Sequence, residues 1–269
     1  MGNGIAHVFA RIGLEVILCD VEQKILDRAL ATITANLERE TAKGKITADE
    51  KSAALSRIVV TVKRDQLASC DFVVEAASEK FEIKSQLFRE LDGLCPAGVI
   101  LASNTSSISI TKLGAATRRA ENVVGMHFFN PVPVMKLVEV VRGLATSDAT
   151  FATVRELAVN LGKTPVEVND APGFVSNRVL MPLLNEAMFA VMEGVATPEA
   201  VDEVFKLGMA HPMGPLALAD FIGLDVCLDI MRVMHNGLGD PKYRPCPLLI
   251  KMVDAGRLGK KSGQGFYKY

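Results

Sequence analysis

The chain has 269 residues, of which 49% are hydrophobic and 6% aromatic, and it contains no tryptophan. This length allows two ordinary domains with sizeable cores. The formal net charge of -1 provides no overall field for nucleic acid or an anionic membrane, and no apolar stretch is long enough for a transmembrane helix. The five cysteines are widely spaced, without a CxxC pair or a zinc-ligand pattern. We therefore expect a cytoplasmic protein with reduced thiols and no metal site.

Short β-branched runs alternate with helical patterns over the first two-thirds of the chain. A short helix is expected over residues 3–12, ended by Gly13. Strands are expected over residues 16–20, 58–62, 72–75, 99–103, 123–127 and 137–141. Helices are expected over residues 21–43 and from the third strand to about Leu94, the first with an apolar face formed by Val21, Ile25, Leu26, Ala29, Leu30, Ile33 and Leu37. This alternation predicts a doubly wound, mostly parallel, Rossmann-like sheet that is buried on both faces.

The pattern changes near Asp170-Ala171-Pro172-Gly173, where the strand signals end. Long helical patterns follow, including one over residues 175–194 with Val179, Leu180 and Leu183 on an apolar stripe. We place a domain boundary between residues 168 and 174. The sequence thus predicts an α/β domain over residues 1–170 and an all-helical domain over residues 171–269.

The start of the chain has features of a dinucleotide site. Asp20 ends the first apolar run, where an acidic residue binds a ribose hydroxyl in dinucleotide folds and disfavours the 2′-phosphate of NADP; alternatively, Asp20 caps the next helix. Gly2 and Gly4 precede the run, but no strand and no complete G-x-G-x-x-G pattern stands before them. If residues 3–12 form the dinucleotide helix, we expect the first strand to lie upstream of Met1, as in an N-terminally truncated chain.

Three polar segments carry the chemistry. LASNTSS at residues 101–107 ends a strand in hydroxyl and amide side chains, a pattern that an ordinary turn also produces. His127 ends another apolar run and taken alone is more often a core residue than a catalyst. Glu139, however, lies within the apolar run LVEVV, where a carboxylate needs a partner. A hydrogen bond to His127 would fix the imidazole tautomer that general-base catalysis requires. DAPGFVSNR places Asn177 just after the domain boundary.

In combination these strings resemble the L-3-hydroxyacyl-CoA dehydrogenase family, and within it the stand-alone bacterial branch that acts on 3-hydroxybutyryl-CoA. SNTSS, GMHFFNPVPVMKLVEVV, DAPGFVSNR, HPMGPLALADFIGLD and GRLGKKSGQGFYKY occur in the family's order and extend over the whole chain. The resemblance implies an NAD-dependent oxidoreductase that interconverts a 3-hydroxyacyl-CoA and a 3-ketoacyl-CoA. It also implies a homodimer formed through the helical domain.

The resemblance also implies roles for individual residues. His127 would be the general base, or the acid in the reductive direction, and Glu139 would orient it. Ser106 and Asn177 would hydrogen-bond the reacting oxygen or the histidine. Lys43, in the basic segment AKGK, would lie near the phosphates of coenzyme A, although a solvated lysine explains it equally well. The implied cofactor contacts are Gly2, Asp20, Glu79, Lys84, Asn104, Ser106, Asn130 and Lys261.

Three other functions remain open at this stage. An NADP-linked relative acting on another β-hydroxy acid is disfavoured by Asp20 and by the FFNPVPVMK string. A structural or catalytically weak member of the same fold would explain the incomplete phosphate-binding loop. A coenzyme A- or nucleotide-binding module without chemistry would leave the His127 and Glu139 pair unexplained.

Overall fold

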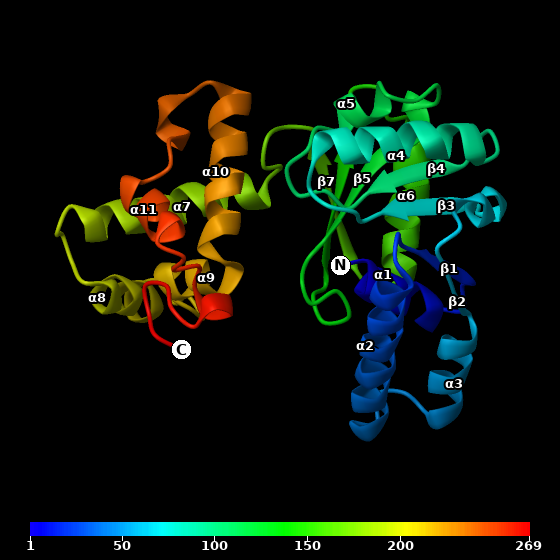
Figure 1. The fold of residues 1–269 in the computed structure, drawn as a ribbon, viewed down its shortest axis with the longest axis horizontal. Coiled ribbons are helices and arrows are strands. Elements are labelled where there is room, and N and C mark those ends of the chain that lie inside the picture. Colours follow the sequence, from blue (N-terminus) through cyan, green and yellow to red (C-terminus); the bar gives the residue numbers. More distant parts are fainter. The chain divides into compact units, whose positions relative to one another are not determined.

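The computed structural model describes Met1–Tyr269, and the chain divides into two compact units, Met1–Asp170 and Ala171–Tyr269 (Figure 1). The first unit combines strands with helices, and the second contains helices without a sheet. The division falls inside the segment where the strand signals of the sequence end. None of the helices combines the length and the apolar character that crossing a lipid bilayer requires.

The α/β unit has the Rossmann-like arrangement that the sequence predicts. Its main sheet has the order β3-β4-β5-β6-β7, formed by Phe72–Glu75, Ile100–Ser103, Val123–Phe128, Leu137–Arg142 and Thr164–Asn169. All neighbours in this sheet are parallel except β5 and β6, which run antiparallel. A separate parallel pair is formed by β1 (Val16–Cys19) and β2 (Ile58–Thr61). Strands β1 and β3 do not pair with each other.

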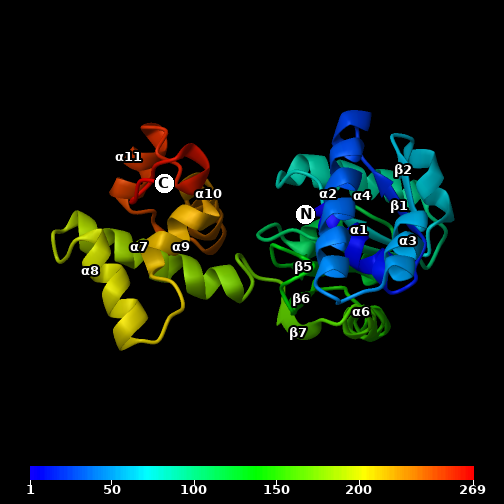
Figure 2. The same cartoon turned by 90° about the horizontal axis from the view of Figure 1, so that it is seen from below.

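Side chains alternate between the two faces of the main sheet along each strand, so both faces carry apolar side chains. Helices cover both of these faces. One face packs against α1 (Gly2–Arg11) and α6 (Asp148–Asn160), in a core that includes Met126 and Val140. The opposite face packs against α5 (Ile110–Gly114), with α4 (Phe81–Leu94) beside that helix. The long helix α2 (Gln23–Ala42) and α3 (Ala48–Ser56) lie side by side and form a further core with α1 and the β1–β2 pair (Figures 1 and 2).

Several local features differ from the expectation, and helices α5 and α6 were among those not predicted. Helix α3 was not predicted, although Thr47 and Glu50 form a complete capping box at its start. Strand β7 was also missed because most of its residues are exposed and its second residue is Pro165, so it lacks an apolar run. The expected apolar face of α2 is too wide: Leu26 and Leu37 are buried, but Val21 precedes the helix and is 67% exposed.

The helical unit is built from α7 (Ser176–Met192), α8 (Pro198–Glu203), α9 (Pro215–Ile222), α10 (Leu224–Leu238) and α11 (Pro247–Asp254). Leucine and methionine side chains form most of its core. Two buried carboxylates hold its parts together: Asp202 accepts hydrogen bonds from the first turn of α9, and Asp220 accepts from the backbone of Phe266 and Tyr267. Val179, on the apolar stripe of α7 that was expected to form core or an interface, is exposed.

Gly125 on β5, two residues before the catalytic candidate His127, has no space for a side chain. A Cβ at this position would lie 2.7 Å from Val141 Cβ and 3.1 Å from the Ile110 side chain. We expect Gly125→Ala to lower the free energy of unfolding by roughly 1–3 kcal/mol because the neighbouring side chains and strand must move. Gly93→Ala is the matched control, since a Cβ within α4 meets no atom within 4 Å. That change should raise stability by about 0.5–1 kcal/mol. Urea unfolding of both variants tests this, and equal stability would contradict it.

Candidate functional site

His127 and Glu139 form a buried pair at the antiparallel β5–β6 step. The register places the two residues directly opposite each other, and His127 Nδ1 lies 2.8 Å from Glu139 Oε2. His127 is 8% exposed and Glu139 is 2% exposed. An ionised carboxylate only accepts hydrogen bonds, so this contact requires the proton on Nδ1 and leaves the basic lone pair of the ring on Nε2. The geometry therefore provides an oriented imidazole of the kind that acid–base chemistry uses.

Glu79 organises the polar loop that follows β4. Its Oε1 accepts hydrogen bonds from the backbone N–H groups of Ser106 and Ser107 at 2.8 and 3.0 Å, and from the hydroxyl groups of Thr105, Ser106 and Ser107. One carboxylate thus fixes three consecutive residues of the loop, including Ser106. The sequence predicted Glu79 as a cofactor contact, and the structure adds this loop-anchoring role.

Several of these contacts also affect the ionisation of Glu79. Burial opposes the charged form, but the hydrogen bond from Thr105 and the nearby Lys84 ammonium favour it. Together with the bonds from Ser106 and Ser107 they hold the pKa of Glu79 below its ordinary value. Glu79 is therefore an anion at neutral pH.

Lys84 and Asn104 lie at the carboxyl ends of β3 and β4. Lys84 on α4 is 1% exposed, and its Nζ lies 2.8 Å from Glu75 Oε1 and 3.4 Å from Glu79 Oε2. Asn104 Oδ1 accepts a hydrogen bond from the backbone N–H of Phe128 at 2.9 Å, which ties the end of β4 to the end of β5. Parallel sheets bind ligands at this edge, so these residues stand where a cofactor is expected.

The start of the chain fits a dinucleotide in its donor and acceptor groups. Helix α1 begins at Gly2, and its N-cap residue, Met1, provides no side-chain cap, although Asn3 Oδ1 accepts the N–H of Gly4 within the first turn. The positive end of the helix dipole suits a pyrophosphate. Asp20 directly follows β1, as the acidic residue of a dinucleotide fold does. It does not cap the next helix, because the N-cap residue of α2 is Glu22 and that helix has no side-chain cap. The helix-capping alternative for Asp20 is therefore wrong.

Three other predicted residues follow β5 or belong to the helical unit. Asn130 follows β5 and is exposed. Asn177 is the buried second residue of α7, in the helical unit. Lys261 also belongs to that unit, where its Nζ pairs with the carboxylate of Asp225 at 2.6 Å. The structure thus brings together His127 with Glu139, and Glu79 with Lys84 and the Ser106 loop.

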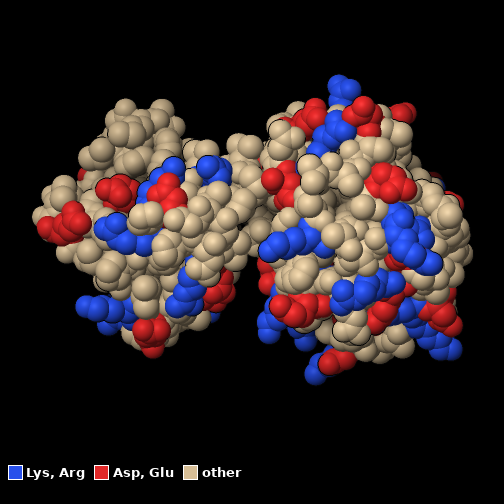
Figure 3. Space-filling view, turned by 90° about the horizontal axis from the view of Figure 1, so that it is seen from above, with Lys and Arg blue, Asp and Glu red and all other residues tan.

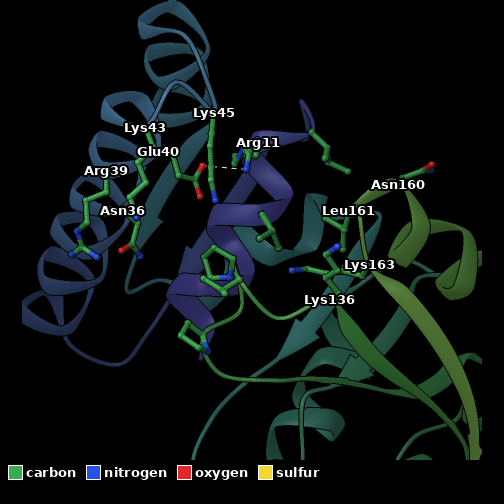
Figure 4. A pocket seen from close by; sticks show the side chains of 16 residues that line it. Arg11, Asn36, Arg39, Glu40, Lys43, Lys45, Lys136, Asn160, Leu161 and Lys163 are labelled. Atoms are coloured by element: carbon green, nitrogen blue, oxygen red, sulfur yellow. Dashed lines mark ion pairs between the residues drawn. The ribbon is translucent and has the colours of Figure 1, made fainter. Parts of the chain in front are cut away.

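A cavity of about 640 Å³ opens between α1, α2 and the segments that flank β6 and β7 (Figure 4). Its wall is strongly basic, with Arg11, Arg39, Lys43, Lys45, Lys136 and Lys163. Glu40 is the one acidic lining residue, and it is paired with Arg11 at 3.1 Å. By contrast, acidic and basic side chains are intermixed over the face of the molecule in Figure 3. The cavity therefore suits a ligand with several negative charges.

Sequence reasoning missed Glu75 and, of the basic residues that line the cavity, all except Lys43. Glu75 is buried beside Lys84, and its only signal was an acid at the end of an apolar run, the same signal that singled out Asp20. Lys163 is buried and donates hydrogen bonds to the carbonyl groups of Val132 and Met135. Burial and then the charge of Arg11 lower the pKa of Lys163. Its contacts to the β5–β6 loop depend on tertiary structure and leave no sequence pattern.

Comparisons with known proteins agree with this architecture. The family model described as "3-hydroxyacyl-CoA dehydrogenase, NAD binding domain" matches residues 1–171, and the corresponding C-terminal domain model matches residues 173–269. A 3-hydroxybutyryl-CoA dehydrogenase of Bradyrhizobium diazoefficiens is 54% identical over 100% of this chain and 92% of its own length. The human mitochondrial hydroxyacyl-coenzyme A dehydrogenase is 42% identical over 100% of this chain and 88% of its own length. The crystal structure of an (S)-3-hydroxybutyryl-CoA dehydrogenase from Ralstonia eutropha superposes with a TM-score of 0.97 at 50% identity, covering 100% of this chain and 95% of that one.

The lowered pKa of Glu79 makes its contribution to stability depend on pH. The charged form is favoured in the folded chain, so the contribution is present above the unfolded-state pKa of about 4.3 and is lost as the pH falls below it. Glu79→Gln should therefore be less stable than the parent at pH 7, and the difference should shrink in acid. Urea unfolding at several pH values measures this. Glu82→Gln, an exposed change on α4, is the control, and a difference independent of pH would contradict the assignment.

Proposed function

The chain belongs to the 3-hydroxyacyl-CoA dehydrogenase family, and we propose that it interconverts (S)-3-hydroxybutyryl-CoA and acetoacetyl-CoA with NAD(H). Relatives that bear the name 3-hydroxybutyryl-CoA dehydrogenase support the short acyl chain. The observation that carries the proposal is the buried contact of 2.8 Å between His127 Nδ1 and Glu139 Oε2. Such a pair in an apolar strand has little purpose in a purely structural protein, because apolar residues would pack there at lower cost.

In the proposed mechanism, His127 moves the proton of the reacting oxygen. Glu139 accepts a hydrogen bond from Nδ1–H of the ring, so Nε2 takes the proton from the 3-hydroxyl group in oxidation and returns it in reduction. NAD, when bound, would supply the acceptor for the hydride of C3. Ser106 and Asn177 are assigned hydrogen bonds to the reacting oxygen. Support for Ser106 comes from its fixed loop, and support for Asn177 comes from the DAPGFVSNR match at the start of α7.

For the cofactor, we propose that the N-terminus of α1 at Gly2 faces the pyrophosphate and that Asp20 accepts from a ribose hydroxyl. The other residues that we propose to contact the cofactor are Glu79, Lys84, Asn104, Ser106, Asn130 and Lys261. The carboxylate at Asp20 favours NAD over NADP because it would repel a 2′-phosphate.

We assign the basic cavity to the phosphate groups of coenzyme A, with Lys43 as one of the contacts. Lys43 is exposed at the C-terminal end of α2, beside Lys45 on the cavity wall. Ammonium and guanidinium groups bind phosphate strongly. Glu40 is the one acidic residue among those that line the cavity.

We also propose a cytoplasmic homodimer. The five cysteines are free thiols, as a reducing compartment favours. The helical unit exposes several large apolar side chains, including Leu207, Val204 and Phe221, and a second copy of the chain would cover them.

The reaction itself is tested by oxidation of NADH with acetoacetyl-CoA, followed at 340 nm. We expect turnover with acetoacetyl-CoA, lower kcat/KM with longer 3-ketoacyl-CoAs, and lower kcat/KM with NADPH. Absence of turnover with every 3-ketoacyl-CoA would overturn the proposed function.

His127→Gln should reduce kcat by roughly 10²- to 10⁴-fold, because the group that transfers the proton is lost. The dissociation constant for NADH should change little, as measured by quenching of its fluorescence. His211→Gln, an exposed change in the helical unit, is the matched control. A parallel loss of NADH binding and turnover in His127→Gln would argue against the assigned role.

Lys43→Ala should raise KM for acetoacetyl-CoA by roughly tenfold, because one charge-assisted contact to phosphate is lost. KM for acetoacetyl-pantetheine, which lacks the nucleotide phosphates, should stay unchanged. Lys112→Ala, which removes an exposed lysine outside the cavity, is the control. Equal effects on both substrates would place the phosphates elsewhere.

Leu207 is 79% exposed, and Leu207→Lys should weaken a dimer formed through the helical unit. We expect the mass measured by sedimentation to fall from that of a dimer toward the 29.0 kDa of a single chain. Leu144→Lys, at a position that is 91% exposed in the α/β unit, should leave the mass unchanged. A monomeric parent chain would refute the dimer.

A further inference from the structure

Lys84 is a buried cation whose position is set by one particular carboxylate. Its Nζ donates to Glu75 Oε1 and Oε2 at 2.8 and 3.0 Å and to the carbonyl of Ala77 at 3.2 Å. An ammonium group that leaves water for a protein interior needs such partners. Glu75 accepts two of these three hydrogen bonds.

Glu75 is itself held by two strands. The residue ends β3, and its register partner on β4 is Ser103, whose hydroxyl donates to Glu75 Oε2 at 2.7 Å. The backbone N–H of Ala77 donates to Oε1. Both oxygens are thus engaged within the sheet edge, so the carboxylate is a fixed reference point for Lys84.

The contacts continue from Lys84 to the Ser106 loop. Nζ of Lys84 lies 3.4 Å from Glu79 Oε2, while the other oxygen of Glu79 accepts the N–H groups of Ser106 and Ser107. Lys84 is therefore shared unequally between two carboxylates, with Glu75 the nearer one. If Glu75 lost its charge, Lys84 would pair with Glu79 alone and draw that carboxylate away from the loop.

We propose that Glu75 is a positioning residue, which holds Lys84 nearer to itself than to Glu79. Glu79 then keeps the Ser106 loop in place, and the side chains of Lys84 and Glu79 present their polar groups to the dinucleotide. Glu75 does not touch the reacting atoms in this scheme. The part of this inference that concerns dinucleotide binding rests on the proposed function. The part that concerns the Ser106 loop applies to the chain without cofactor.

The central test is Glu75→Gln, which keeps the size of the side chain and removes its charge. In the chain without cofactor, amide hydrogen exchange of Ser106 and Ser107 should become faster by roughly tenfold or more, because Glu79 accepts these N–H groups less well. The dissociation constant for NADH should rise by roughly tenfold. Glu82→Gln on the exposed side of α4 is the matched control and should alter neither.

A second variant covers the case in which Glu75→Gln does not fold. Glu75→Met combined with Lys84→Met removes both buried charges at nearly constant volume, a change that proteins often tolerate. Because no ammonium remains to draw Glu79 away, exchange of the Ser106 and Ser107 amides should stay close to that of the parent. NADH binding should still be weak, since Lys84 is absent.

Two results would overturn the proposal. One is parent-like amide exchange and NADH binding in Glu75→Gln together with a lower melting temperature, which would make Glu75 a structural residue only. The other is fast exchange of Ser106 and Ser107 in the double variant, which would mean that Glu75 acts on the loop without Lys84. Failure of the parent chain to reduce acetoacetyl-CoA would refute the proposed function instead, while the exchange measurement without cofactor would still decide the role of Glu75.

Discussion

A carboxylate within an apolar strand is the constraint on which the α/β unit depends. Glu139 is almost completely buried on β6, and the antiparallel register with β5 supplies His127 as its partner. An unpaired charge at this depth would cost several kcal/mol. The antiparallel pairing of β5 and β6 in an otherwise parallel sheet therefore makes the contact between His127 and Glu139 possible, because it places these residues directly opposite each other. Lys163 reinforces this pairing by bonding to the carbonyl groups of Val132 and Met135 in the loop between the two strands.

The sequence was sufficient to predict those parts of the fold that bury apolar residues in a regular pattern. The strand of His127, the strand of Glu139 and helix α1 all lie within one or two residues of their expected limits, and the predicted fold class is confirmed. Strand β7 and helix α3 were missed because the first is mostly exposed and the second is short and weakly amphipathic. In both cases the stabilising contacts are tertiary or capping interactions, which hydrophobic periodicity does not report.

The candidate site was predictable to a different degree. The buried acid at position 139 required a partner, so physical reasoning led directly to His127. Glu79 and Lys84 were singled out only by the family resemblance, as cofactor contacts, and Glu75 was singled out by neither source. A hydrogen-bond network that joins the ends of two strands to a helix and a loop depends on distances across the fold, as the contacts of Ser103 with Glu75 illustrate. The assigned roles of these residues stay predictions until they are measured.

The attachment of the Ser106 loop to Glu79 limits how the site can stabilise negative charge. The N–H groups of Ser106 and Ser107 already donate to a carboxylate, so they cannot form the pair of backbone donors that acyl-transfer enzymes direct at an alkoxide. In the proposed mechanism, the charge on an oxygen near this loop is instead removed by proton transfer with His127. The architecture is therefore suited to moving a hydride and a proton together, and poorly suited to a tetrahedral adduct with a long-lived charge.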